Sequence, residues 1–163
     1  MNPSQSLRSV ARMAATVVPI LFLAGAGNAI AKHDDRDPIE GAFNATVTIK
    51  NCSTGAVLGN ARALLLFHSG GTVTIDNTQA PARRGLILGT WEAKKGKRYT
   101  SEVSHFNYFE DGTLSGVNKI RRTIVLGHDA DSFTADLRVQ VFGVDGTLLA
   151  EVCPTEVGTR VTF

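Results

Sequence analysis

The sequence has little of the features that would assign it to a specialised class of protein. Of its 163 residues, 7% are aromatic and 20% are charged, and it contains two cysteines, five prolines and one tryptophan. Arg8 and Arg12 account for the formal charge of +2, because the other 15 of the 17 basic residues balance the 15 acidic ones. Without a basic excess beyond residue 31, nucleic-acid binding is not predicted. The composition is typical of one ordinary globular domain.

Short motifs of common catalytic and metal sites are also missing from the sequence. It contains no G-x-S-x-G, P-loop, G-x-G-x-x-G, H-E-x-x-H or EF-hand pattern. His68 and Ser69 are adjacent, so on a strand they would face opposite ways. The Asp-rich run after His128 is explained by a turn. We therefore predict no cofactor and no metal site, and a binding role is favoured over an enzymatic one.

The first 31 residues have the order of a secretory signal peptide. A polar stretch with Arg8 and Arg12 precedes an uncharged apolar run, which ends in Ala29-Ile30-Ala31, a small-x-small cleavage pattern. Cleavage after Ala31 would leave a charged lead-in, residues 32–40, and one domain, residues 41–163. The alternative is an uncleaved anchor, because 19 uncharged residues separate Arg12 from Lys32. We expect a secreted or periplasmic protein that meets the membrane only during export.

Export changes the interpretation of Cys52 and Cys153. In an oxidising compartment each has one possible partner, so a disulfide is predicted, and two isolated thiols are the alternative. Neither cysteine has the C-x-x-C or Cys/His spacing of a redox or zinc site.

From Gly41 onward the apolar residues repeat with a period of two, which indicates β-strands. Strands are expected over residues 41–50, 61–68, 72–76, 86–93, 98–109, 114–126, 132–142 and 148–152, with 159–163 as a ninth candidate. Asp111-Gly112 and Asp145-Gly146 predict tight type I′ hairpins. Consecutive hairpins form an antiparallel up-and-down meander, and strands of about ten residues favour a closed barrel of eight or nine strands. Closure would place Cys52 and Cys153 on neighbouring strands at the seam.

Candidate binding residues are polar side chains on strands whose other face is apolar. Arg122 and Asn118 share a face with Ile120 and Ile124, so either Arg122 holds a ligand carboxylate, or it plugs the barrel end, or a bulge or a different register turns it away from that face. His105 is the best polar candidate for the interior, Tyr108 is a further candidate on the same strand, and Trp91 is included as a candidate ligand contact. A bulge midway along 98–109 would reconcile the two faces of that strand.

Two short motifs carry a resemblance to a known family. Gly89-Thr90-Trp91, followed by a hairpin meander, resembles the G-x-W element of the lipocalin-like (calycin) barrels. The resemblance implies an up-and-down barrel with an interior for a small apolar ligand. It also implies that Trp91 packs near the closed end against a basic residue, for which Gly158-Thr159-Arg160 supplies Arg160. The barrels of allene oxide cyclase and dirigent proteins are a second compatible architecture.

Several functions remain open from the sequence. The leading hypothesis is a barrel that binds a small hydrophobic or amphiphilic ligand, unless large inner residues such as Phe43, Phe67, Leu88 and Phe133 fill it. A cofactor-free isomerase or cyclase would use His105, Glu102, Tyr108 or Arg122. A structural or protein-interaction barrel is a third possibility. An outer-membrane barrel is disfavoured, because one tryptophan and two tyrosines are too few for two aromatic girdles.

Overall fold

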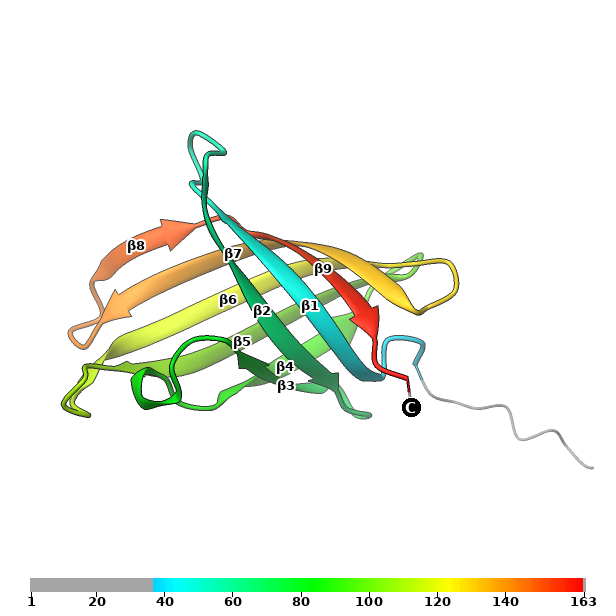
Figure 1. Cartoon of the computed structure of the whole chain (residues 1–163). Helices are drawn as coiled ribbons and strands as arrows, with labels where there is room; N and C mark the ends of the chain where they lie inside the picture. The colour runs from blue at the N-terminus through cyan, green and yellow to red at the C-terminus, as the bar shows by residue number, and fades with distance from the viewer. Residues whose placement is uncertain (1–36, 163) are drawn as a thin grey trace, which may run out of the picture. The chain divides into compact units, whose positions relative to one another are not determined.

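The computed structural model describes residues 37–162, and the regular secondary structure of this part of the chain is almost entirely β-strand (Figure 1). The nine strands are β1 (Gly41–Lys50), β2 (Val57–Phe67), β3 (Thr72–Asn77), β4 (Ile87–Ala93), β5 (Arg98–Tyr108), β6 (Leu114–Leu126), β7 (Ser132–Gly143), β8 (Leu148–Val152) and β9 (Thr155–Arg160). A short 3₁₀ turn, η1 (Pro81–Arg83), separates β3 from β4. No helix between residues 37 and 162 is long and apolar enough to cross a membrane. The expected signal peptide, residues 1–31, lies outside the described residues.

The strands form an antiparallel meander that closes into a barrel, as predicted. Strands β1 to β7 pair in sequence order, and β9 returns to lie between β7 and β1. The closing register runs from Phe43 opposite Arg160 to Thr48 opposite Thr155. Eight strands make the ring, while β8 pairs with the second half of β7, next to the first half that pairs with β9. In Figure 1 the β1–β2 pair crosses over the strands β5 to β7.

The seam carries the predicted disulfide between Cys52 and Cys153, whose Cα atoms are 4.8 Å apart. Next to it, Asn51 and Val152 form a β-bridge, and the Cys153 N–H donates to the Lys50 carbonyl at 2.9 Å. The disulfide therefore joins the tip of the β1–β2 hairpin to the connection between β8 and β9.

Both Asp-Gly hairpins form, but the predicted type I′ geometry is wrong. Only the glycines, Gly112 and Gly146, have positive φ, at 81° and 82°. In the first turn the Gly112 N–H donates to the Phe109 carbonyl and the Phe109 N–H to the Thr113 carbonyl, which is a three-residue loop closed by a glycine bulge. The Asp111 carboxylate accepts hydrogen bonds from the N–H and hydroxyl of Thr113, so the aspartate stabilises the turn through its side chain.

Strand β5 needs no bulge midway along its length, contrary to expectation. Tyr99, Ser101, Val103 and His105 alternate inward without interruption. The irregularity lies at the end of the β5–β6 pair, where Asn107 faces Gly116 and Tyr108 faces Leu114, which leaves Ser115 as the extra residue on β6.

Two expectations about other strands were also wrong. The last strand begins at Thr155, before the expected 159–163 segment. Leu88 was counted among the interior residues but is 50% exposed, because Ile87 and Gly89 occupy the inner face of β4.

Aromatic rings fill one end of the barrel. Phe43, Phe67 and Phe133 meet edge to face with centroids 5.3 to 6.5 Å apart, and all three are buried. Ile39, at the end of the expected lead-in, is also fully buried. This end is therefore a packed core.

Arg160 covers the aromatic end of the barrel, but it packs against Phe43 and not against Trp91, the side chain that the resemblance implied. Its guanidinium lies 4.5 Å from the centroid of Phe43 and donates to the carbonyls of Pro38, Glu40 and Ala130. Trp91 is only half-buried, and it packs against Phe67 and Tyr99. The expected pairing of Trp91 with Arg160 is replaced by Phe43 with Arg160.

Candidate functional site

Four polar residues are buried in the described part of the barrel: Ser101, His105, Arg122 and Glu156. They lie on strands β5, β6 and β9, where the two-residue period turns them toward the interior together with the apolar residues. A buried polar group costs free energy unless it is hydrogen-bonded, and a buried charge must be paired. Their partners therefore determine what the interior can do.

Arg122 and Glu156 form a buried ion pair. The Arg122 Nε donates to Glu156 Oε2 at 3.0 Å, and the two side chains are 4% and 0% exposed. The pair is only partly satisfied, because Arg122 Nη1 and Glu156 Oε1 have no hydrogen-bond partner among residues 37–162. Register places Ser101 on one side of Arg122 and Leu137 on the other, and the Ser101 hydroxyl also lacks a partner within this range.

A second polar chain runs through His105. Asn107 Nδ2 donates to Asn118 Oδ1 at 2.7 Å, and Asn118 Nδ2 contacts His105 Nε2 at 3.2 Å. The His105 Nδ1 lies 3.3 Å from the Phe106 carbonyl. A neutral ring protonated on Nδ1 satisfies both contacts, since it donates to the carbonyl and accepts from Asn118. Burial lowers the pKa of His105, a backbone hydrogen bond to Phe106 partly opposes this, and the charge of Arg84 lowers it further.

His105, Asn118 and Arg122 border an interior cavity of about 340 Å³, near the lower end of the range of about 300–1,000 Å³ for small-molecule pockets. Its walls are mostly aliphatic side chains from seven strands. The wall residues are Val47, Ile49, Ala61, Ala63, Ile75, Ile87, Ile120, Leu137, Val139 and Val152. His105, Asn118 and Arg122 supply polar atoms to this otherwise apolar lining.

Arg122 marks the floor of the cavity. On β6, Ile120 and Arg122 line the cavity but the next inward residue, Ile124, does not. On β1 the lining likewise stops at Val47, and Ala45 lies beyond it toward the aromatic end. The guanidinium therefore stands between the aromatic core and the open half of the barrel.

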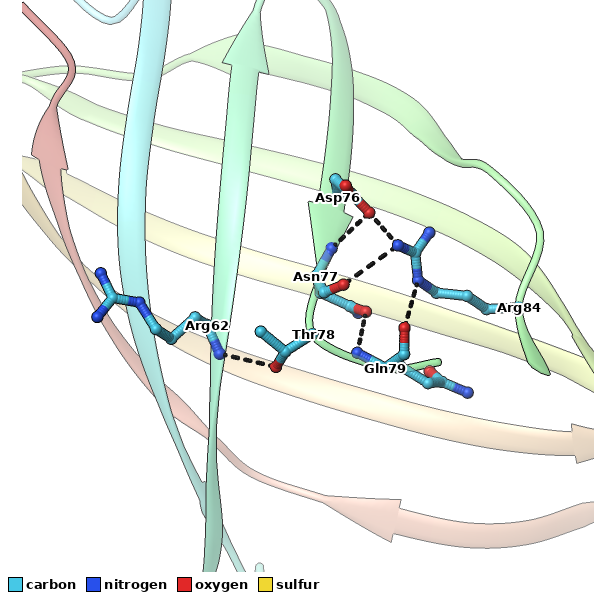
Figure 2. A network of polar contacts seen from close by, with 6 residues as sticks. All are labelled: Arg62, Asp76, Asn77, Thr78, Gln79 and Arg84. Atoms are coloured by element: carbon cyan, nitrogen blue, oxygen red, sulfur yellow. Dashed lines mark hydrogen bonds and ion pairs between the residues drawn. The ribbon is translucent and has the colours of Figure 1, made fainter. Parts of the chain in front are cut away.

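A hydrogen-bonded loop forms one side of the cavity mouth, where Arg62, Asn77, Thr78 and Gln79 line the cavity (Figure 2). The Thr78 N–H donates to the Arg62 carbonyl at 3.1 Å, and the Arg62 N–H donates to the Thr78 hydroxyl at 3.2 Å. The pairing of β2 with β3 ends at Ala63 and Asn77. These two hydrogen bonds attach the loop that follows β3 to the next residue of β2, beyond that pairing.

Arg84 fixes the rest of this loop. Its guanidinium pairs with Asp76 and donates to the carbonyls of Asn77 and Gln79 (Figure 2). The Arg84 side chain is 10% exposed although its carboxylate partner is 65% exposed, so the cation is the buried member of the pair. The loop is thus a defined part of the rim.

Of the five residues predicted for a binding site, His105, Asn118 and Arg122 meet at the cavity. Trp91 and Tyr108 do not line it. The Trp91 indole N–H donates to the His68 carbonyl at 3.0 Å, and Tyr108 is half-buried at the end of β5 opposite Leu114.

Sequence reasoning missed Glu156 as a member of the site. One signal pointed to it: Arg122 on an apolar face requires an acid, and Glu156 is the only acidic residue after Cys153. Glu156 already neutralises the guanidinium, so a ligand carboxylate is not needed to balance the charge of Arg122.

Comparison of the chain with protein-family models, with curated proteins and with solved structures gives no match.

Proposed function

We propose that the barrel binds a small, largely apolar molecule in its interior cavity. One observation carries this proposal. The cavity is lined by aliphatic side chains and ends at the buried guanidinium of Arg122, whose Nη1 has no partner among the described residues. An apolar wall with a few placed polar atoms is the usual chemistry of a small-molecule site. The lipocalin-like resemblance of Gly89-Thr90-Trp91 is consistent with this use of a barrel.

The packing of the molecule supports the same proposal. At about 30 Å³ per water the cavity has the volume of roughly eleven water molecules. An unfilled space of this kind lowers stability, because its lining loses dispersion contacts. Ala61 and Ala63 keep the space open at positions where larger side chains would close it. Three phenylalanines fill the opposite end of the barrel. The cavity therefore results from the smaller side chains that line the other half.

The proposed site of action is outside the cytoplasm. The Cys52–Cys153 disulfide is compatible with an oxidising compartment, and the signal-like order of residues 1–31 points to export.

A catalytic role for His105 has one observation in its favour, namely a buried imidazole at the cavity, whose pKa burial lowers. A general base needs a ring nitrogen that can reach the substrate proton. Both nitrogens are engaged within the protein, Nδ1 on the Phe106 carbonyl and Nε2 on Asn118. We therefore favour binding over catalysis.

The proposal is tested by measuring thermal shifts of the wild-type protein with compact uncharged probes, 1-indanone and 1-indanol, at millimolar concentration. We expect both to raise the unfolding temperature, because a ligand that binds only the folded state stabilises it. In the variant Ala63→Leu the added side chain occupies the cavity, so the response should disappear although the variant remains folded.

The matched control is Ala150→Leu, which places the same side chain at an exposed position on β8. It should respond to the probes as the wild type does. Absence of any response in the wild type, or an equal response in Ala63→Leu, would count against the cavity as the binding site.

A further inference from the structure

We infer that the molecule held in the cavity presents an uncharged oxygen acceptor, a carbonyl or a hydroxyl, to Arg122 Nη1, and that it is not a carboxylate or an amine. This inference rests on the proposed function and specifies the chemical class of the ligand.

The donor at the floor of the cavity is buried and has no hydrogen-bond partner among the described residues. Arg122 is 5% exposed and lines the cavity. Its Nε donates a hydrogen bond to Glu156, while Nη1 has no partner among residues 37–162. A donor left unsatisfied in a low-dielectric interior is costly, and an acceptor brought by a ligand would remove that cost. The floor of the cavity therefore selects for an oxygen at the inner end of the ligand.

Arg122 and Glu156 are the two charged residues buried in the described barrel, and their charges cancel. A ligand carboxylate at Nη1 would place a second negative charge beside Glu156 with a single guanidinium between them. An ammonium would place a second positive charge beside Arg122. Either ion would be desolvated without a compensating partner, whereas a carbonyl or hydroxyl leaves the interior neutral.

The neighbouring polar groups do not alter the charge balance between Arg122 and Glu156. His105 is neutral, since its pKa is lowered chiefly by burial, and it is occupied by Phe106 and Asn118. The cationic Arg62 lines the cavity at its mouth and donates to Asn44 on the outside of the barrel. An anionic ligand would therefore be drawn to the rim and away from the floor, and it would bind in the opposite orientation.

The test uses five ligands that share one bicyclic body: indane, 1-indanone, 1-indanol, indane-1-carboxylate and 1-aminoindane. Dissociation constants are measured by calorimetry at neutral pH with the wild-type chain. The ketone and the alcohol should bind about tenfold more tightly than indane, as expected for a hydrogen bond from a charged donor. The carboxylate and the amine should bind more weakly than indane.

Two variants separate the hydrogen bond from the charge balance. Arg122→Met with Glu156→Leu removes the ion pair as a unit, and the ketone should then lose its advantage over indane. Glu156→Gln keeps the guanidinium but removes its counter-charge, so indane-1-carboxylate should gain at least about tenfold in affinity relative to the wild type. If Glu156→Gln folds poorly, the carboxylate should raise its unfolding temperature more than 1-indanone does, which provides a second reading of the same preference.

The outcomes distinguish the two proposals. If none of the five ligands binds the wild type, the proposed function itself fails. If the carboxylate binds the wild type best, or if the ketone keeps its advantage in the variant without the ion pair, the cavity binds ligands but the inferred class is wrong. Weak carboxylate binding that Arg62→Gln abolishes would place the anion at the rim, as expected for an anion kept from the floor, whereas carboxylate binding that survives Arg62→Gln and is lost in Arg122→Met with Glu156→Leu would overturn the inference.

Discussion

The Arg122–Glu156 pair determines both the chemistry and the energetics of the barrel interior. Taking two ions out of water is expensive, and one hydrogen bond of 3.0 Å returns only part of that cost, because one further polar atom on each side chain has no partner within residues 37–162. We conclude that the pair is poorly explained as a device for stability. A polar group that a ligand completes is a better account of why it lies at the floor of a cavity.

The first prediction follows from this asymmetry. Arg122→Met alone and Glu156→Gln alone should each lower the free energy of unfolding by about 3–5 kcal/mol, because each leaves one buried charge without its partner. The double variant Arg122→Met with Glu156→Leu should lose much less than either single variant. Urea unfolding at constant m-value measures all three. Additive losses in the double variant would show that the two residues act independently.

The second prediction concerns His105 and pH. Burial lowers its pKa in the folded protein below the ordinary value of 6.5, so between these two pKa values the unfolded chain binds a proton that the folded chain does not. Stability should therefore fall as the pH drops below about 6.5 and should level off below the folded-state pKa. In His105→Gln this part of the pH dependence should be missing from the urea midpoint.

The control for His105 is His128→Gln, which changes an exposed histidine in the turn between β6 and β7. A pH profile of His105→Gln that coincides with those of the wild type and His128→Gln would contradict the prediction.

Single residues also mark the limit of what the sequence predicts about the site. Asn118, Arg122 and His105 were found because each shares a face with apolar neighbours on its own strand. Glu156 was missed because its neighbour Gly158 has no side chain to show which face is buried. In the fold, Gly158 faces Phe133 so closely that a Cβ there would overlap the ring. The inward face of β9 is thus defined by a residue on another strand.

At the scale of strands and turns, the prediction succeeded where one face of a strand is continuously buried. Strands β6 and β8 have the predicted bounds, and β5 differs by one residue. The first residues of β2 were missed, because Val57 and Leu58 are 60% and 59% exposed and show no alternation. The alternation of apolar and polar residues in a strand reflects the burial of one face. It is therefore absent where a hairpin extends beyond the barrel wall and both faces are exposed.

The cavity could not be predicted from any one element. It depends on alanines of β2 facing aliphatic residues on other strands, and the size of a space across a barrel is a property of register. Alternation alone predicted an apolar interior but left open whether that interior was filled.

The third prediction concerns the disulfide, which joins two elements 101 residues apart in the chain. Replacing both cysteines by serine should lower the free energy of unfolding by about 4–5 kcal/mol in the loop-entropy model. It should also weaken 1-indanone binding, because Val152 and Pro154 next to the bridge line the cavity. Urea unfolding and calorimetry provide the two measurements.

Reductant supplies the control for the disulfide. It should destabilise the wild type and leave the double-serine variant unchanged, since Cys52 and Cys153 are the chain's two cysteines. Equal stability of the wild type and the double-serine variant would remove the seam from the account of how the barrel is held closed.

At the scale of the whole molecule, the barrel has two halves with different packing. One half contains buried phenylalanines and the Arg160 cap, and the other contains the cavity and the loop of Figure 2. Dense packing gives the first half many dispersion contacts, whereas the second half lacks them over the volume of the cavity. Folding stability is therefore expected to be concentrated away from the proposed site, in keeping with the low local stability that binding regions often have.

The last prediction is a gradient of hydrogen exchange along the barrel. Amides near Phe43, Phe67 and Phe133 should be protected close to the global free energy of unfolding, because these residues are at most 1% exposed. Amides in β8 and at the start of β2 should exchange faster, since β8 pairs along its length only with β7, and β2 meets β3 only from Ala63 onward. Saturating 1-indanone should slow exchange in the cavity half and leave the aromatic half nearly unchanged. Uniform protection throughout the barrel, or equal slowing in both halves, would contradict this division, and mass-spectrometric exchange on peptides from each strand would detect either result.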